Sequence, residues 1–236
     1  MRTITLEEHF VTASFIKATD RPGHKIHAAI AQLHPKLLDL GAGRIAAMDE
    51  AAIDFQVLSL ASMGLEPLAA DVAAPLIRDI NDELAAAIKA NPKRLGGFAA
   101  LAMQDPKNAA KELDRCITRL KFCGVMLDGT TGGLFLDDPK FLPVWEAAAA
   151  LRVPVYLHPA LPPEQVREVY YSGLPGEIGL ALSNRIMFSV DYPFSPNTNG
   201  RAFLDSLSGT LSAEDYAKLS YINAEKVLKL EASSRG

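Results

Sequence analysis

Short apolar runs that alternate with helix-length segments constrain the fold of this chain more than any other feature of its sequence. Six runs with the composition of β-strands lie near residues 3–7, 55–61, 95–101, 124–128, 154–158 and 185–190. Between them we expect helices at 44–52, from a cap at Asp71 to about Ala90, after Asp105 and Pro106, and at 138–151. A repeat of this kind is typical of a parallel sheet covered by helices, so the sequence predicts an α/β fold.

The residues that follow these runs favour a closed barrel over an open sheet. Glycines and polar side chains come directly after the runs, as they do at the catalytic face of a (β/α)8 barrel. No glycine-rich phosphate loop follows the first run, which disfavours an open doubly wound sheet. We therefore expect a (β/α)8 TIM-barrel type of fold that forms a single domain over residues 1–236, with an irregular excursion at about 11–43.

The number of runs is smaller than a closed barrel requires. Eight strands close such a barrel, and the sequence offers six. Only the 25 residues 159–183 stand where two further βα units of roughly 30 residues each would be expected. The sequence thus predicts a barrel that lacks about two βα units, with the truncated region at about 160–184.

Potential metal ligands stand at the ends of three of these runs. Glu7 and His9 are two residues apart, so both side chains would project to one face of a strand. His158 ends the run at 154–158, and Asp191 directly follows the last run. A carboxylate and imidazoles that share one face can bind a divalent ion. The sequence therefore predicts one metal site made by Glu7, His9, His158 and Asp191.

Composition and charge exclude several classes of partner. The net charge of −4 and the absence of a basic block argue against nucleic acid. No apolar run approaches the ~18 residues of a membrane span, and Glu7 and Glu8 interrupt the first hydrophobic stretch, so we expect neither a membrane anchor nor a signal peptide. Cys116 and Cys123 alone cannot make a disulfide framework, and a cytoplasmic location is the simplest expectation.

These motifs, in this order, resemble one branch of the amidohydrolase superfamily, the metal-dependent decarboxylases of aromatic acids. That branch includes the γ-resorcylate, dihydroxybenzoate and aminocarboxymuconate semialdehyde decarboxylases. Its motifs match residues 6–10 (Leu-Glu-Glu-His-Phe), 80–82, 91–99, 105–106, 124–129, 136–140, 153–159, 185–194 and 223–224. The first segment is the variant in which Glu-x-His replaces the His-x-His of the superfamily.

The resemblance implies a function and a set of roles. It implies a carbon–carbon lyase that decarboxylates a small aromatic or unsaturated carboxylic acid, with Glu7, His9, His158 and Asp191 as metal ligands and Asp191 as the proton carrier. It also implies one divalent ion, zinc or manganese before magnesium, and no organic cofactor. Members of the branch form homodimers or homotetramers, and we expect the same here.

One element of the branch has no counterpart in this sequence. The family carries Gly-His-x-Gly-Glu on its sixth strand, whereas residues 175–179 (Pro-Gly-Glu-Ile-Gly) contain no histidine. The missing element belongs in the region where the strand count also falls short, and both shortages indicate one internal deletion. Two alternatives to the decarboxylase therefore stay open: a metal-dependent hydrolase of a lactone or amide, and a catalytically dead barrel that binds metal or a partner.

Several other residues have two interpretations. Phe10 and Met63 could line an apolar wall of a substrate pocket, or they could pack in the core. Asp128 and Thr130 could contact substrate, but Asp-Gly-Thr-Thr-Gly is also ordinary turn chemistry, and we favour the turn. His24, His27 and His34 are interpreted as loop or surface residues, not as a second metal site.

Overall fold

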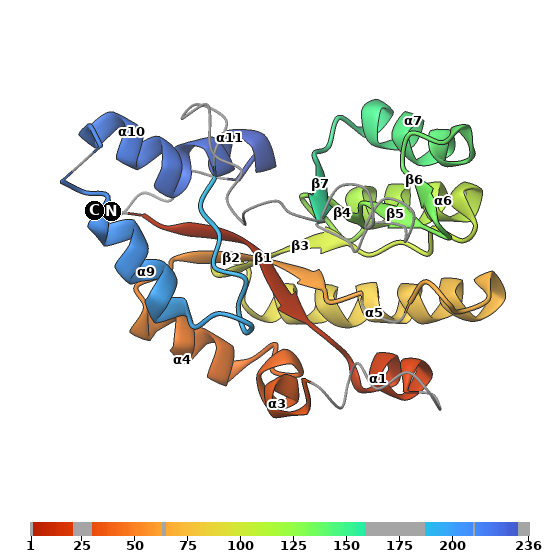
Figure 1. The fold of residues 1–236 in the computed structure, drawn as a ribbon, viewed down its shortest axis with the longest axis horizontal. Coiled ribbons are helices and arrows are strands. Elements are labelled where there is room, and N and C mark those ends of the chain that lie inside the picture. The colour runs from red at the N-terminus through yellow and green to blue at the C-terminus, as the bar shows by residue number, and fades with distance from the viewer. Residues whose placement is uncertain (1, 21–29, 63–64, 159–186, 210, 231–236) are drawn as a thin grey trace, which may run out of the picture.

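The computed structural model describes residues 2–20, 30–62, 65–158, 187–209 and 211–230. Strands and helices alternate along the described chain (Figure 1). The strands are β1 (Ile4–Phe10), β2 (Phe55–Leu60), β3 (Leu95–Ala99), β4 (Gly124–Asp128), β5 (Thr130–Thr131), β6 (Leu134–Phe135) and β7 (Val155–His158). The helices are α1 (Ala13–Thr19), η1 (Ala31–Leu33), α3 (His34–Leu37), α4 (Ala42–Glu50), α5 (Ala70–Ala90), α6 (Pro106–Thr118), η2 (Pro139–Phe141), α7 (Leu142–Leu151), α9 (Asn197–Ser206), α10 (Ala213–Ala217), η4 (Lys218–Ile222) and α11 (Asn223–Leu228).

Five of the described strands form one parallel sheet in the order β1-β2-β3-β4-β7, and β5 and β6 make a short antiparallel hairpin. A single parallel bridge between Leu6 and Ser189 places the segment 187–190 beside β1. The last strand run expected at 185–190 is therefore reduced, in its described residues, to one bridge. The α/β fold and the parallel sheet are confirmed.

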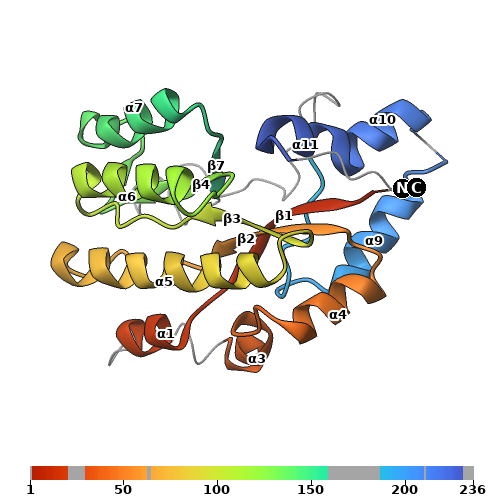
Figure 2. The same ribbon diagram turned by 180° about the vertical axis from the view of Figure 1, so that it is seen from behind.

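Side chains on the two faces of this sheet belong to two separate hydrophobic clusters. Leu58, Val125 and Leu127 face the larger cluster, which lies under α5, α6 and α7. Val57 and Met126, one residue away along the same strands, face the smaller cluster, where Ala224 and Leu228 of α11 pack. Figures 1 and 2 show the result: α5 and α6 lie on one side of the sheet, and α11 lies on the other. The strict alternation follows from the two-residue period of a β-strand.

A bulge in β1 shifts this alternation just before the candidate ligands. Thr5 of β1 pairs with Gln56 of β2, and Glu8 pairs with Leu58. Leu6 and Glu7 therefore lie opposite the single residue Val57. Glu7, inside the bulge, has a φ of 62°, in the left-handed region that non-glycine residues rarely adopt. Without the bulge, His9 would lie on the face opposite to that of Ile4 and Leu6. With it, His9 faces the same side as they do.

Some helix boundaries differ from the sequence prediction. The long helix begins at Ala70, with Ala69 as its N-cap, so the expectation that Asp71 caps it is wrong. Asp71 instead lies in the first turn, where a carboxylate still interacts favourably with the helix dipole. The helix expected at 138–151 is divided into η2, capped by Asp138, and α7. The start of α6 at Asp105 and Pro106 is confirmed, and the Asp105 side chain caps it by accepting a hydrogen bond from the Asn108 amide.

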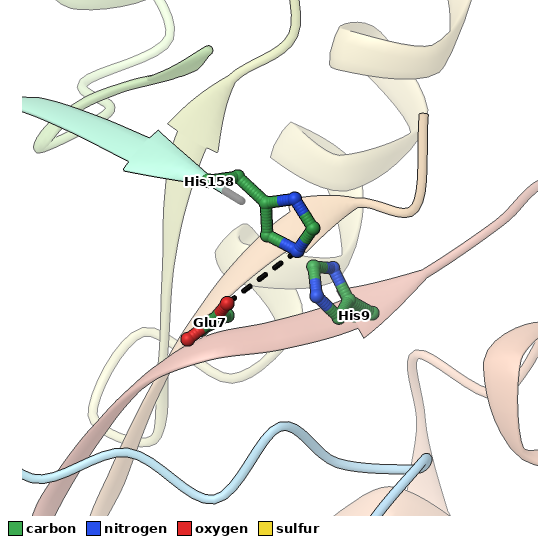
Figure 3. Close-up of side chains that lie close together, drawn as sticks. All are labelled: Glu7, His9 and His158. Atoms are coloured by element: carbon green, nitrogen blue, oxygen red, sulfur yellow. Dashed lines mark ion pairs between the residues drawn. The ribbon is translucent and has the colours of Figure 1, made fainter. Parts of the chain in front are cut away.

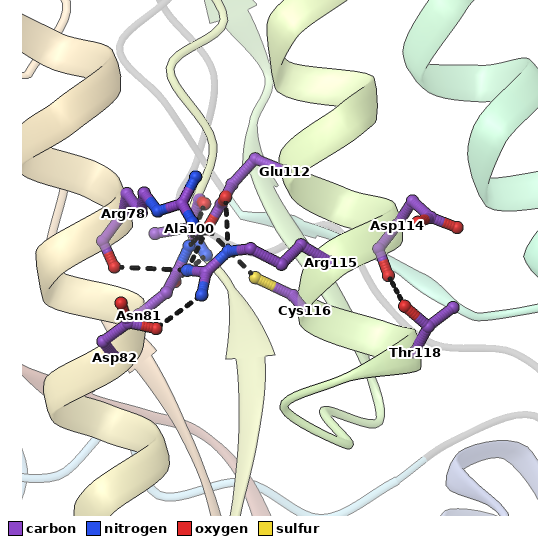
Figure 4. A network of polar contacts seen from close by, with 9 residues as sticks. All are labelled: Arg78, Asn81, Asp82, Ala100, Glu112, Asp114, Arg115, Cys116 and Thr118. Atoms are coloured by element: carbon purple, nitrogen blue, oxygen red, sulfur yellow. Dashed lines mark hydrogen bonds and ion pairs between the residues drawn. The ribbon is translucent and has the colours of Figure 1, made fainter.

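A buried polar network holds α5 and α6 against the end of β3 (Figure 4). The Asn81 side chain donates to the Ala100 carbonyl and accepts from the Ala100 amide, at 3.0 Å in both cases. It also donates to Glu112 of α6, and Arg115 pairs with Glu112 and with Asp82 of α5. Asn81 therefore satisfies backbone groups that the end of β3 leaves without a strand partner. None of the helices in the described ranges is long and apolar enough to cross a membrane.

Candidate metal centre

Three of the predicted ligands meet where β1 and β7 end (Figure 3). Glu7, His9 and His158 each offer one ligand atom within 4.8 Å of the others. His158 Nε2 lies 3.4 Å from Glu7 Oε1, and the two imidazole rings stand nearly perpendicular with centroids 5.2 Å apart. Carboxylate and imidazole atoms this close form a suitable donor set for a divalent ion.

Asp191 approaches this group from the other end of the chain. Its Oδ1 lies 3.3 Å from His9 Nε2, and the same oxygen is buried without a hydrogen-bond donor among the described residues. Asp191 has a φ of 63°, so the backbone here, as at Glu7, is in the left-handed region. A buried carboxylate oxygen that lacks a donor and faces the ligand nitrogen of a histidine is what a missing cation would satisfy. The residues present therefore fit a metal ion.

Each histidine has a polar group beside its other nitrogen. His9 Nδ1 lies 3.2 Å from the Ser59 hydroxyl, and His158 Nδ1 lies 3.4 Å from Asp128 Oδ1. These partners leave both Nε2 atoms directed toward the centre. Metal-binding histidines usually have such a partner, because it fixes the ring orientation and the tautomer.

Asp128 lies in the site, and the turn interpretation favoured from the sequence missed this role. Its Oδ2 accepts a hydrogen bond of 2.6 Å from the Ser62 hydroxyl, which leaves Oδ1 directed at His158. The Asp128 carboxylate raises the pKa of His158 above its usual value, while partial burial opposes the shift. Its position at the end of a predicted strand could have indicated this role, since the same position identified His158 as a candidate ligand.

Glu7 has its own hydrogen-bond partner, Tyr156 of β7. The Tyr156 hydroxyl donates a hydrogen bond of 2.5 Å to Glu7 Oε2. Burial, together with the Glu7 carboxylate, raises the pKa of Tyr156, so this hydroxyl stays protonated and remains a donor. One oxygen of Glu7 is thus held by Tyr156, and the other faces His158.

A cavity of about 590 Å³ opens directly over the centre. Apolar residues from the ends of β2, β3 and β4 form much of its wall, and His9, His158, Asp191 and Phe194 lie in it. The Phe194 and His9 rings form a T-shaped pair with centroids 5.7 Å apart, and Phe194 is 37% exposed. Phe10 is not among the described lining residues and packs in the larger hydrophobic cluster. Met63, His24, His27 and residues 175–179 lie outside the described residues.

A family model described as amidohydrolase matches residues 26–179. The chain belongs to the amidohydrolase family. Among characterised amidohydrolases it is 36% identical over 181 residues to the γ-resorcylate decarboxylase of a Polaromonas species, covering 71% of this chain and 53% of that protein. It is also 36% identical over 186 residues to the γ-resorcylate decarboxylase of Rhodococcus jostii, covering 75% of this chain and 56% of that protein. The chain therefore spans about half the length of these relatives.

Solved amidohydrolase structures share the fold. A 5-carboxyvanillate decarboxylase from Novosphingobium aromaticivorans, with bound manganese and a nitrobenzoic acid, superposes with a TM-score of 0.83 at 24% identity, covering 97% of each chain. The 2,6-dihydroxybenzoate decarboxylase from Rhizobium superposes with a TM-score of 0.80 at 22% identity, covering 98% of this chain and 100% of that one. At this level of identity the likeness establishes the fold alone.

Proposed function

We propose that the protein is a metal-dependent decarboxylase of a small aromatic carboxylic acid. The observation that carries this proposal is the convergence of Glu7, His9 and His158 under a cavity, with Asp191 against His9. Each of the two histidines has its Nδ1 beside a polar partner. The γ-resorcylate decarboxylases to which the chain is similar act on a substrate of this class, which supports the assignment.

Glu7, His9, His158 and Asp191 would hold one divalent ion. When bound, the ion supplies a Lewis acid that orients a carboxylate and a neighbouring phenol oxygen and stabilises negative charge on the ring. We propose manganese or zinc, with magnesium as the third candidate; manganese is bound in the 5-carboxyvanillate decarboxylase that shares the fold. No organic cofactor is needed for this chemistry.

The cavity suits a small aromatic acid. Its volume of about 590 Å³ is within the range of small-molecule sites, and much of its wall is apolar. Phe194 lines the cavity beside His9 and is partly exposed, which suits packing against an aromatic substrate. No lysine or arginine is among the described lining residues, which supports a metal ion as the group that binds the substrate carboxylate.

Asp191 is the proposed proton carrier. Its side chain is 49% exposed, and it lines the cavity while one oxygen contacts His9. In the proposed reaction, Asp191, which takes a proton from solvent water in each turnover, gives that proton to the ring carbon that carries the carboxylate. The carbon–carbon bond then breaks, its electron pair restores the ring, and CO₂ leaves.

We also propose how the whole chain is organised. A bridge that sets residue 189 beside β1 is the neighbour relation that the last and first strands have in a closed barrel. This supports a single (β/α)8-type domain over residues 1–236 that lacks about two βα units at about 160–184. We propose that it forms a homodimer or homotetramer, as its resemblance to the decarboxylase branch implies, and that it works in the cytoplasm, as its low cysteine content suggests.

The direct test is a substrate screen with the full chain after loading with Mn²⁺ or Zn²⁺. We expect 2,6-dihydroxybenzoate or a related hydroxybenzoate to lose CO₂. Chromatography of the phenol product measures the reaction. Asp191→Ala should lower both bound metal and turnover. Opening of a lactone with no reaction of hydroxybenzoates would favour the hydrolase instead, and metal binding without any turnover would favour a catalytically dead barrel.

A further inference from the structure

Glu8 is a fully buried carboxylate that joins the two ends of the chain behind the candidate metal centre. It is 0% exposed, and it is not among the described residues that line the cavity. Its Oε1 accepts a hydrogen bond of 3.2 Å from the Val190 amide, and its Oε2 accepts one of 3.0 Å from the Tyr192 amide. These two donors are the backbone groups on either side of Asp191.

The backbone around Asp191 needs such support. Asp191 has a φ of 63°, a left-handed conformation that non-glycine residues rarely adopt. The segment 187–190 makes one bridge to β1 and is not part of a continuous strand ladder. Besides the Glu8 contacts, the His9 amide donates to the Tyr192 carbonyl at 2.7 Å. Glu8 and His9 therefore hold the two residues that flank Asp191 from adjacent positions in β1.

Glu8 is itself held in place by neighbouring elements. Gln56 of β2 donates from Nε2 to Glu8 Oε2 at 3.3 Å. The buried Arg44 of α4 donates to the His9 carbonyl at 2.7 Å and lies over the Tyr192 ring. The bulge at Glu7 sets Glu8 on the same side as Leu58 and away from the cavity. The side chain is thus fixed by the sheet before it contacts the segment that carries Asp191.

We propose that Glu8 is a positioning residue that sets the Asp191 carboxylate against the metal centre by holding the Val190 and Tyr192 amides. This inference rests on the proposed metal centre and adds a residue that touches neither the metal nor the substrate. It rests on the geometry of the two backbone amides, one of which donates to each carboxyl oxygen of Glu8.

A double-mutant cycle with Mn²⁺ affinity as the readout tests the proposal. Glu8→Gln keeps the size of the side chain but replaces one acceptor with an amide donor, which cannot bond to a backbone N–H. We expect Glu8→Gln to weaken Mn²⁺ binding by about 10–100-fold, the usual effect of removing an outer partner of a metal ligand. In the Asp191→Ala background, the same change should alter Mn²⁺ affinity by less than about twofold, because the residue through which Glu8 acts is gone.

Ser220→Ala is the matched control for a general loss of stability. Ser220 is also buried and polar, its hydroxyl donates to the Tyr216 carbonyl at 2.6 Å, and it lies outside the cavity lining. It should lower the melting temperature and leave Mn²⁺ affinity unchanged. If Glu8→Gln does not fold, Glu8→Asp, which is too short to reach both amides, takes its place in the cycle.

The outcomes separate this proposal from the proposed function. Equal losses of affinity from Glu8→Gln with and without Asp191 would overturn the positioning role while leaving the metal centre intact. An unchanged affinity in Glu8→Gln would overturn it as well. If the unmodified protein binds no Mn²⁺ or Zn²⁺, the proposed function itself fails first, and the positioning role fails with it.

Discussion

The Asp128 carboxylate holds the imidazole ring of the candidate ligand His158 in place. It lies between the Ser62 hydroxyl and His158 Nδ1, so it fixes the ring from the side opposite to the centre. We expect Asp128→Ala to weaken Mn²⁺ binding by about 10-fold or more, since outer partners of metal-binding histidines contribute 10–100-fold. Isothermal titration calorimetry at neutral pH measures this.

The control for Asp128 is Thr130→Val, which changes a polar lining residue two positions further along the chain. It should leave metal affinity within about twofold, because no contact joins Thr130 to the histidines among the described residues. Equal effects of the two changes would mean that Asp128 acts only through the shape of the loop.

Glu8 gives the second prediction at the residue scale, which concerns stability and pH. Burial raises the pKa of Glu8 to about 8, although the Tyr192 amide and the charge of Arg44 act in the opposite direction. Between about pH 4.5 and 8 the unfolded chain has lost this proton and the folded chain keeps it. The free energy of unfolding of the metal-free protein should therefore fall as pH rises through this window, by at most about 1.4 kcal/mol per pH unit from this group.

Urea unfolding at several pH values between 5 and 8 would measure the slope. Glu8→Gln has no ionisable group here, so its slope should be smaller than that of the unmodified protein. Glu214→Gln, at an exposed carboxylate that pairs with Lys218, serves as the control and should keep the original slope. Identical slopes in the unmodified protein and Glu8→Gln would contradict the prediction.

At the scale of elements, Asn81 connects α5 to the end of β3. Its amide makes two hydrogen bonds with the Ala100 backbone in a buried position, and Ala100 lines the cavity. Asn81→Leu would leave the Ala100 amide and carbonyl buried without these partners, at a cost of roughly 1–3 kcal/mol for each unsatisfied group. We expect a clear loss of stability in thermal or urea unfolding.

Asp82→Ala is the matched control on the same helix. Asp82 pairs with Arg115, but its side chain is 49% exposed, so its removal should cost no more than about 1 kcal/mol. A similar loss in both variants would show that the charged part of the network, and not the Asn81 bonds, holds α5 to the sheet.

The elements also show what the sequence can and cannot predict. The apolar runs located four of the five paired strands to within one or two residues, because hydrophobic period and turn residues act locally. The first strand extends three residues beyond its expected end at residue 7. The sequence indicated that Glu7 and His9 share a face by simple alternation, and the two side chains do meet. They meet, however, through the bulge at Glu7, which depends on pairing with β2 and leaves no local signal. The contact of Asp128 with His158 was not predicted, because an aspartate at this position is equally typical of a turn.

At the scale of the whole molecule, the candidate metal centre contains residues from both ends of the chain. Glu7 and His9 lie at the start, His158 lies near the middle, and Asp191 follows the last bridge to β1. The order of motifs indicated this ligand set through resemblance. The contacts that join its two ends, from Glu8 and His9 to residues 190 and 192, depend on the folded sheet and could not be read from the sequence.

The charge of the cavity couples substrate binding to the metal. Glu66, Asp128 and Asp191 line it, and no lysine or arginine is among its described lining residues. Among the described lining residues, a carboxylate that enters the metal-free cavity meets three carboxylates that repel it and no lysine or arginine to replace its hydration. The proposed divalent ion reverses this balance, so the affinity for a carboxylate should depend on the metal.

Thermal unfolding with 2,6-dihydroxybenzoate measures this coupling directly. With Mn²⁺ present, the acid should raise the melting temperature beyond the effect of the metal alone, because a ligand bound to the folded state adds RT ln(1 + [L]/Kd), about 2.7 kcal/mol at 100 times Kd. With a chelator present, the acid should cause no shift. Resorcinol has the same ring and hydroxyls without the carboxylate. The shift in melting temperature that it causes should differ far less between the Mn²⁺ and chelator conditions. An equal shift by the acid with and without metal would mean that groups other than the ion bind the carboxylate, and the proposed role of the centre in orienting substrate would then be wrong.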